Sequence, residues 1–519
     1  MKNDAKHTMD RAAKMPVLMI VEGFFVGLVA GGVVLLYRIL LTHAGKWLHA
    51  ILDYTRNSPL KMAGWFLVLI LLAILVGKLV KMEPMISGSG IPQLEGEMAG
   101  KLDPVWWKVL PAKFLGGFLS LLGGLSLGRE GPSIQLGAMA GKGISKCFHL
   151  GKTEEKHLLT CGASAGLAAA FNAPLAGVLF SLEEIHKNFS VSVLISVMTA
   201  SITANVLTNG VLGAQPVFQF AVAGNLPQRY YWMLIVLGVI LGFMGAFYNW
   251  FTLQIQSIYQ KATWLNTTGK LLIPFLLAGV LGYTMPEILG GGDSLVEALT
   301  SGEMVLVSAV IFWIAKFVFS AVSFGSGAPG GIFFPLLVLG SLIGGIFGMG
   351  CVQVFGLPAE YVNNFILLAM AGYFTAIVRA PLTGIILIFE MTGSLSQLLS
   401  LSTISIVAYV VATLLKSEPI YESLLERILK KQGKGKTEPT GKKILTEYVI
   451  MHGSSLEGHT IGEIQWPEHT LIVAVKGQGG EVLPKGNTML LASDTIVLMT
   501  EEGCFAQVNE EIRKLCEEK

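Results

Sequence analysis

Charged side chains are scarce in this 519-residue chain. Asp, Glu, Lys and Arg make up only 14% of the residues, whereas 52% are hydrophobic and the mean hydropathy is +0.62. A soluble core cannot bury so many apolar residues. Runs of roughly 20 apolar residues, long enough to span a bilayer, recur up to about residue 415. Examples are 17–36, 62–80, 230–250 and 397–415. The composition excludes a wholly soluble protein and predicts a polytopic helical membrane protein.

Several marks of other protein classes are missing. The five cysteines are scattered without metal-ligand spacing, which predicts reduced packing residues. The sequence has no nucleotide phosphate loop, no nucleophile–base pair and no metal-ligand set, so we expect no enzyme, no cofactor and no metal. A net charge of +2 gives no reason to expect nucleic acid as a partner. The apolar run from Val17 lacks a signal cleavage pattern, so we interpret it as a first membrane helix.

Glu130 is an isolated carboxylate in a long apolar stretch, residues 111–141, whose other charges near it are Lys113 and Arg129. An ionised group at membrane depth costs several kcal/mol unless it has a partner or lines a water-filled cavity, so it is a functional candidate. The flanking glycines and Pro132 are typical of a helix start that lets main-chain N–H groups approach a ligand. GREGP at 128–132 therefore predicts a helix N-terminus facing a binding cavity.

The stretch around Glu130 occurs twice. A shift of 203 residues superimposes Ala112–Phe114 on Ala315–Phe317, and a shift of 207 superimposes APLxG at 173–177 on APLxG at 380–384. The matched positions that follow are Lys113 and Lys316, Gly124 and Gly327, Gly128 and Gly331, Pro132 and Pro335, Gly137 and Gly340, Gly141 and Gly344, and Glu183 and Glu390. Matching Gly/Pro-broken apolar halves indicate a transporter built from two repeats, with the substrate site where broken helices meet.

The domain organisation follows from composition. We expect a cytoplasmic tail at 1–16, membrane repeats at 17–213 and 230–425, and a polar linker at 214–229 between them. A basic connector at 426–443 favours a cytoplasmic C-terminus. Residues 444–519 predict a small soluble α+β domain, with strands at 471–475, 488–491 and 495–499, a turn at 477–480 and a helix near 505–518.

Helix starts of the Gly-then-Pro type recur at GSGIP (88–92), GREGP (128–132) and GGIFFP (330–335). Helix N-termini carry free N–H groups and partial positive charge, so they bind anions without a full cation. Ser89 and Tyr421 add hydroxyl donors. Such a site binds a transported anion and still releases it.

These motifs, with the late Pro-x-Tyr at 419–421, resemble the four signature regions of the CLC chloride channel and transporter family, in the same order over about residues 17–425. The resemblance implies a homodimer in the cell membrane, with one pore per subunit and two inverted repeats in each. It also implies proton-coupled chloride exchange, with both termini cytoplasmic. The anion site that it implies consists of Gly88, Ser89, Gly131, Ile332, Phe333 and Tyr421.

Two glutamates carry the implied proton coupling. Glu130 matches the external gate, whose carboxylate competes with chloride, and Glu184 matches the internal proton-transfer glutamate of the exchangers. Structural alternatives stay open: a helix cap for Ser89, an interfacial position for Tyr421 and a solvated helix end for Glu184. We expect Glu183 to satisfy helix-end donors, as its repeat mate would, and the repeat-mate lysines at 113 and 316 to be structural.

The C-terminal segment resembles the TrkA-C module of potassium-uptake regulators through GSSLEGxTI at 453–461, PxGxT at 484–488 and AxDxI at 492–496. The resemblance implies a cytoplasmic regulatory domain for a small ligand, an ion or nucleotide; a dimerising domain without a ligand is the alternative. For the whole chain, the alternatives to an exchanger are a passive chloride channel and a carrier of another ion. A cation carrier should carry more clustered intramembrane carboxylates.

Overall fold

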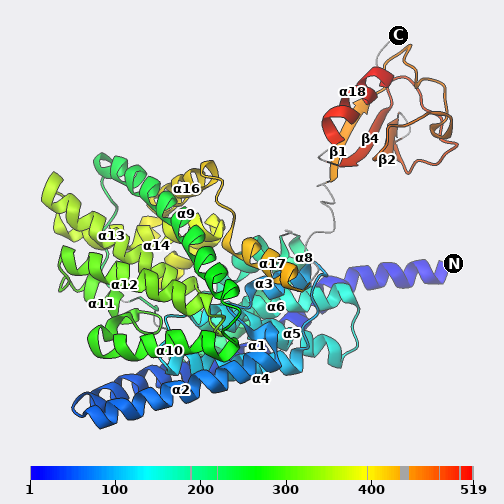
Figure 1. Cartoon of the computed structure of the whole chain (residues 1–519). Helices are drawn as coiled ribbons and strands as arrows, with labels where there is room; N and C mark the ends of the chain where they lie inside the picture. Colours follow the sequence, from blue (N-terminus) through cyan, green and yellow to red (C-terminus); the bar gives the residue numbers. More distant parts are fainter. Residues whose placement is uncertain are drawn as a thin grey trace. The chain divides into compact units, whose positions relative to one another are not determined.

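The computed structural model describes residues 2–187, 190–214, 216–218, 220–393, 395–432, 443–477, 480–501 and 504–516. The chain forms two compact units, Met1–Ile428 and Leu429–Lys519, each described by itself (Figure 1). In the described part of unit 1, eight helical segments are long and apolar enough to cross a membrane.

The first half of unit 1 runs from α1 to α8. Its α-helices are α1 (Lys2–Arg56), α2 (Pro59–Met82), α3 (Ile91–Met98), α4 (Trp106–Leu122), α5 (Glu130–Cys147), α6 (Lys152–Phe171), α7 (Pro174–Phe180) and α8 (Val191–Leu212). A 3-10 turn, η1 (Pro84–Ile86), precedes α3, and a π-helical turn, η2 (Ser181–His186), continues α7.

The second half repeats this order after η3 (Gln228–Tyr230). Its α-helices are α9 (Tyr231–Lys261), α10 (Thr267–Thr284), α11 (Asp293–Thr300), α12 (Leu306–Gly325), α13 (Phe333–Phe355), α14 (Val362–Val378), α15 (Pro381–Thr392), α16 (Leu398–Leu414) and α17 (Ile420–Lys431). The 3-10 turns are η4 (Pro286–Ile288), η5 (Ala359–Tyr361) and η6 (Leu395–Gln397). In each half, a 3-10 turn is followed by an eight-residue helix, α3 or α11. The next helix, α4 or α12, ends just before the Gly-rich start of α5 or α13.

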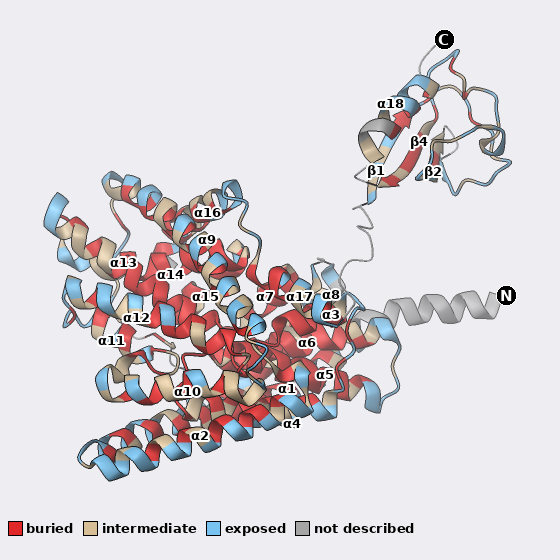
Figure 2. Cartoon of the chain, viewed as in Figure 1, coloured by how far each residue is buried: buried red, intermediate tan, exposed pale blue. Residues whose placement is uncertain are grey.

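The glycines matched between the two repeats allow neighbouring helices to pack closely. A side-chain carbon on Gly137 of α5 would overlap the backbone of Gly162 on α6, and one on its mate Gly340 would lie 2.9 Å from the Ala369 carbonyl oxygen on α14. Small residues let membrane helices approach until their backbones touch. Most residues of α5, α6 and α14 are buried as a result (Figure 2).

Unit 2 contains a four-stranded antiparallel sheet in the order β1-β4-β2-β3, built from β1 (Lys443–Val449), β2 (Thr470–Gly477), β3 (Gly480–Val482) and β4 (Thr495–Glu501). The helix α18 (Phe505–Cys516) contributes Val508 and Ile512 to its core, and a 3-10 turn, η7, spans Ile461–Glu463.

The strands expected at 471–475 and 495–499 lie within β2 and β4. The strand expected at 488–491 is wrong: Met489 forms only an isolated bridge with Thr460, because no continuous partner strand lies beside it. Two residues of the predicted turn at 477–480, and positions 433–442 of the basic connector, lie outside the described residues.

Candidate anion and proton sites

The starts of α5 and α13 are joined by two main-chain hydrogen bonds. The Gly128 N–H donates to the Gly331 carbonyl at 2.7 Å, and the Gly331 N–H donates to the Gly128 carbonyl at 2.8 Å. The loop before α3 joins them, because the Gly330 N–H donates to the Gly88 carbonyl at 3.0 Å. Three helix starts that are distant in the sequence therefore meet at one point.

Glu130 is fully buried as the first residue of α5, as GREGP predicts. Its Oε1 accepts a hydrogen bond from the Phe334 N–H in the first turn of α13, and its Oε2 has no partner among the described residues. The carboxylate therefore lies at the N-terminus of the other repeat's helix, where free N–H groups favour negative charge.

Ser89 lies beside this junction. Its side chain is 2% exposed, and its hydroxyl has no partner among the described residues. A side-chain carbon on Gly131 would collide with that hydroxyl and lie 3.2 Å from the Gly331 Cα. Glycine at 131 thus leaves room for the Ser89 hydroxyl. Ser89 caps no helix by a side-chain hydrogen bond, since the N-cap residue of α3 is Gly90.

Tyr421 and the start of α13 supply the remaining predicted groups. Tyr421 is the second residue of α17, fully buried, and its hydroxyl also lacks a partner in the described part of the chain. Ile332 and Phe333, at the N-cap and first position of α13, are fully buried as well. A buried hydroxyl without a hydrogen bond costs free energy. Two such hydroxyls near free helix N-termini fit a site for a small anion.

Lys113 and Lys316 do not supply positive charge to the candidate anion site. The Lys113 ammonium donates to the Ile86 and Gly88 carbonyls at 2.9 and 2.6 Å. The Lys316 ammonium donates in the same way to the Ile288 and Gly290 carbonyls, at 2.9 and 2.8 Å. Each lysine holds the loop before its repeat's short helix, which confirms the structural interpretation.

Glu184 lies on the π-helical turn η2, which continues α7, and it is 5% exposed. The turn η2 packs against α3, where Glu95 is equally buried and interacts electrostatically with Glu184. Sequence reasoning missed Glu95. The criterion that selected Glu130, an acid within apolar membrane sequence, also applies to Glu95 six residues after Ser89.

An ion pair connects the Glu184 turn to the Tyr421 helix. The Lys187 ammonium lies 2.6 Å from the Glu422 carboxylate, and both side chains are about half exposed. Lys187 follows η2, and Glu422 is the residue after Tyr421. The segment that carries the candidate proton acceptor is therefore fixed to a helix that carries a candidate anion ligand.

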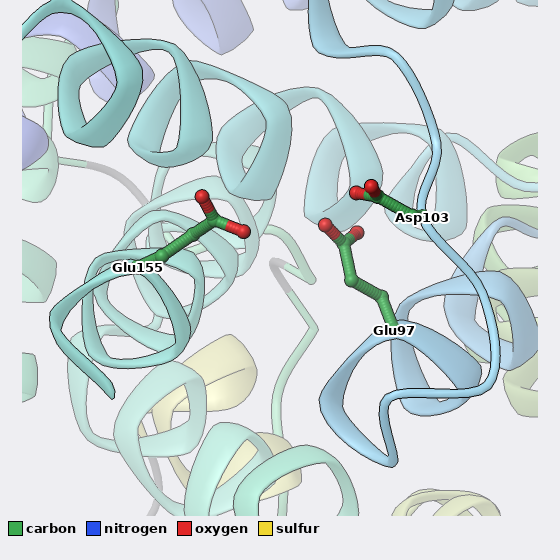
Figure 3. Close-up of side chains that lie close together, drawn as sticks. All are labelled: Glu97, Asp103 and Glu155. Atoms are coloured by element: carbon green, nitrogen blue, oxygen red, sulfur yellow. The ribbon is translucent and has the colours of Figure 1, made fainter. Parts of the chain in front are cut away.

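Three further carboxylates, Glu97, Asp103 and Glu155, lie within 4.8 Å of one another (Figure 3). The Lys142 ammonium from α5 lies against Glu97 and 2.7 Å from Asp103, and it also donates to the Pro104 carbonyl at 2.7 Å. Lys146 and Lys152 pair with Glu155 at 2.5 and 3.2 Å. Lysines balance the acids here, so the cluster is an ion-pair network that fixes α3 to α5.

The family profile described as voltage gated chloride channel matches residues 72–413, and the TrkA-C domain profile matches 445–512. The chain is 36% identical over 390 residues to the H(+)/Cl(-) exchange transporter ClcA of Klebsiella pneumoniae subsp. pneumoniae, covering 73% of this chain and 80% of that protein. The ClcA of Salmonella arizonae is 36% identical over 406 residues, or 75% and 83%.

Solved structures agree in fold. A slow cyanobacterial Cl-/H+ antiporter superimposes with a TM-score of 0.76 at 31% identity, over 80% of this chain and 99% of that one. A CLC-type fluoride/proton antiporter gives a TM-score of 0.64 at 22% identity, over 78% and 97%, which shows the fold alone. The two repeats described above are thus the inverted halves of the CLC fold.

Proposed function

Because the chain belongs to the voltage gated chloride channel family, we propose that it exchanges chloride for protons across the cell membrane. The observation that carries the proposal is the position of the Glu130 carboxylate on the N-terminus of α13. A negative group already lies where helix dipoles favour an anion. Chloride and this carboxylate then compete for the same binding position, and protonation of the carboxylate leaves that position to chloride.

The anion path runs past the junction of the helix starts. The Ser89 and Tyr421 hydroxyls, which have no hydrogen-bond partner among the described residues, donate to a chloride ion, and the Ile332 and Phe333 main-chain N–H groups face it from α13. Gly88 and Gly131 let the backbone approach. Amide and hydroxyl dipoles bind chloride without a permanent cation, so the ion is released as readily as it enters.

Glu130 acts as the gate between this path and the outside. In its ionised form it accepts the Phe334 hydrogen bond and excludes chloride; when protonated it loses its attraction to the helix end and leaves. Each departure carries a proton, which links proton movement to chloride movement.

Glu184 supplies protons from the cytoplasmic side. A site made of N–H and O–H donors offers no base, so protons need a separate titratable route. Glu184 and Glu95 form a buried carboxyl pair beside the half-exposed Lys187–Glu422 ion pair. Two buried carboxyl groups that lie close together disfavour ionisation of both, so the pair takes up a proton more readily than a single exposed carboxyl group. A passive channel would not need this pair, which favours the exchanger over the channel.

The assembly is a homodimer with both termini in the cytoplasm, and unit 2 is a regulatory domain for a small ligand. Exposed apolar side chains on α8 and α16, such as Ile202 and Ile406, suit contact with lipid or with a second copy.

Glu130→Gln in reconstituted vesicles tests the function. The variant mimics the protonated gate, so chloride should flow passively while proton movement stops. The matched control is Glu360→Gln, an exposed acid outside the path, which should behave as the wild type. Uphill proton transport that persists in Glu130→Gln would contradict the proposal.

A further inference from the structure

A cavity of about 620 Å³ opens beside Glu130. Its lining includes Lys46 and His49 of α1 and the loop Gly290–Asp293 before and at the start of α11. Gly128 and Arg129, the two residues before Glu130, also line it. The cavity therefore approaches Glu130 from the side on which α11, the short helix of the second repeat, lies.

The loop that lines this cavity is the repeat mate of the loop that carries Ser89. Gly88 and Gly90 have φ angles of 66° and 96°, and Gly290 and Gly292 have φ angles of 56° and 98°. Lys113 and Lys316 hold the two loops by equivalent pairs of carbonyls. The backbone conformation that presents the Ser89 hydroxyl to the anion in the first repeat thus recurs in the second repeat, where the loop lines this cavity.

The two loops differ in their side chains. Where the first has Ser89 and Ile91, the second has Gly291 and Asp293. The first turn of α3 has no acid, whereas α11 begins with Asp293. The second loop therefore presents an exposed carboxylate, which repels anions and attracts protons.

A short chain of contacts connects this carboxylate with the gate. A side-chain carbon on Gly291 would lie 3.2 Å from the Asp293 Oδ2 and 3.0 Å from the Phe334 ring. Phe334 lines the cavity, and its N–H binds the Glu130 carboxylate. Asp293 interacts electrostatically with Glu130 and with Lys316, whereas the first turn of α3, the matching helix of the first repeat, has no acid.

We propose that Asp293 is a positioning residue for the outer proton step, through its negative charge in the cavity beside Glu130. The inference rests on the proposed role of Glu130. A negative charge nearby stabilises the neutral, protonated carboxyl group relative to the ionised one. It also lowers the local concentration of chloride, so that the outer face exchanges protons at a higher external pH than it would without Asp293.

Other titratable or charged groups lie around the same region. They are Lys46 and His49 from α1, Tyr37 also from α1, Arg129 before α5, Lys316 from α12 and Glu297 from α11. Arg129 opposes the effect of Asp293 on Glu130, and Lys316 already donates to two carbonyls. Glu297 is an exposed acid on the same helix and in the same cavity wall, which makes it the matched control.

The test is the external pH dependence of chloride flux in vesicles, for Asp293→Asn and Glu297→Gln. Asp293→Asn should move the midpoint to lower external pH by about 0.3–1 unit, the size expected for one charge at moderate distance. Glu297→Gln should move it by less than half as much. Asp293→Ser, which also suits a helix start, repeats the test if Asp293→Asn folds poorly.

An unchanged midpoint in the Asp293 variants, or a shift no larger than that of Glu297→Gln, would overturn the inference. Because chloride flux is measured, the midpoint exists even for a protein that moves chloride without protons. Failure of this inference is therefore distinguishable from failure of the proposed exchange.

Discussion

Glu183 and Glu390 each cap a helix of the other's repeat. The Glu390 carboxylate accepts hydrogen bonds from the Leu175 and Ala176 N–H groups, at 3.0 and 2.8 Å, in the first turn of α7. Glu183 does the same for α15, where Leu382 and Thr383 donate at 3.4 and 2.9 Å. The prediction that Glu183 satisfies helix-end donors is confirmed, and the donors belong to the opposite half of the chain.

Removing one of these caps should destabilise the membrane unit. Glu390→Ala leaves two N–H groups without their charged acceptor, and hydrogen bonds to charged groups contribute about 1.5–3 kcal/mol. The thermal midpoint in detergent should fall relative to the wild type, whereas Glu360→Ala, at an exposed position, should leave it nearly unchanged. Equal midpoints for the two variants would show that the reciprocal caps do not stabilise the fold.

The sequence predicted the repeat because Gly, Pro and Glu recur at fixed spacing, and the structure uses those positions for contacts between helices. It could not predict which N–H group binds Glu130. The resemblance assigned the Ile332 and Phe333 N–H groups to the anion but did not say which N–H group binds the Glu130 carboxylate, and in the structure it is that of Phe334. The spacing within a helix start does not fix how deeply a side chain from another helix enters it.

Glu95 was missed for a similar reason. Its importance depends on the packing of α3 against η2, which carries Glu184 89 positions later in a π-helical turn that no sequence pattern indicated. The strand expected at 488–491 was wrong because a short apolar run does not show whether a partner strand lies beside it.

Substitution of Ser89 should change anion selectivity. The family resemblance connects serine at this position with chloride and proline with nitrate, and proline removes both the hydroxyl and the main-chain donor. Ser89→Pro should raise nitrate transport relative to chloride, and Ser89→Ala, which removes only the hydroxyl, should lie between it and the wild type. The measurement is the ratio of the two fluxes in vesicles. Identical ratios in all three proteins would place Ser89 outside the anion site.

Glu95→Gln should keep both fluxes. A glutamine amide has the shape of a protonated carboxyl group and still donates to Glu184, so it replaces the partner that retains the proton. Glu95→Leu removes the polar neighbour of Glu184 and should lower proton flux several-fold at similar chloride flux. Loss of proton flux in Glu95→Gln itself would mean that Glu95 transfers protons directly and does not only position Glu184.

Deletion of unit 2 after about residue 440 should alter regulation without abolishing transport. The groups assigned to the anion and proton paths all lie at or before Glu422. A ligand of a regulatory domain shifts an equilibrium only by its differential affinity for two states. The chloride flux of the folded, dimeric truncation should stay within a few-fold of the wild type. Complete loss would make unit 2 part of the transport machinery.

The most direct test of the account is proton movement driven by chloride. Purified protein is reconstituted in vesicles with a chloride gradient and no proton gradient, and internal pH and chloride are recorded together. The account predicts that wild-type protein moves protons uphill, and that Glu184→Gln keeps chloride flux but moves no protons. Wild-type chloride flux without any proton movement would contradict it and make the protein a channel.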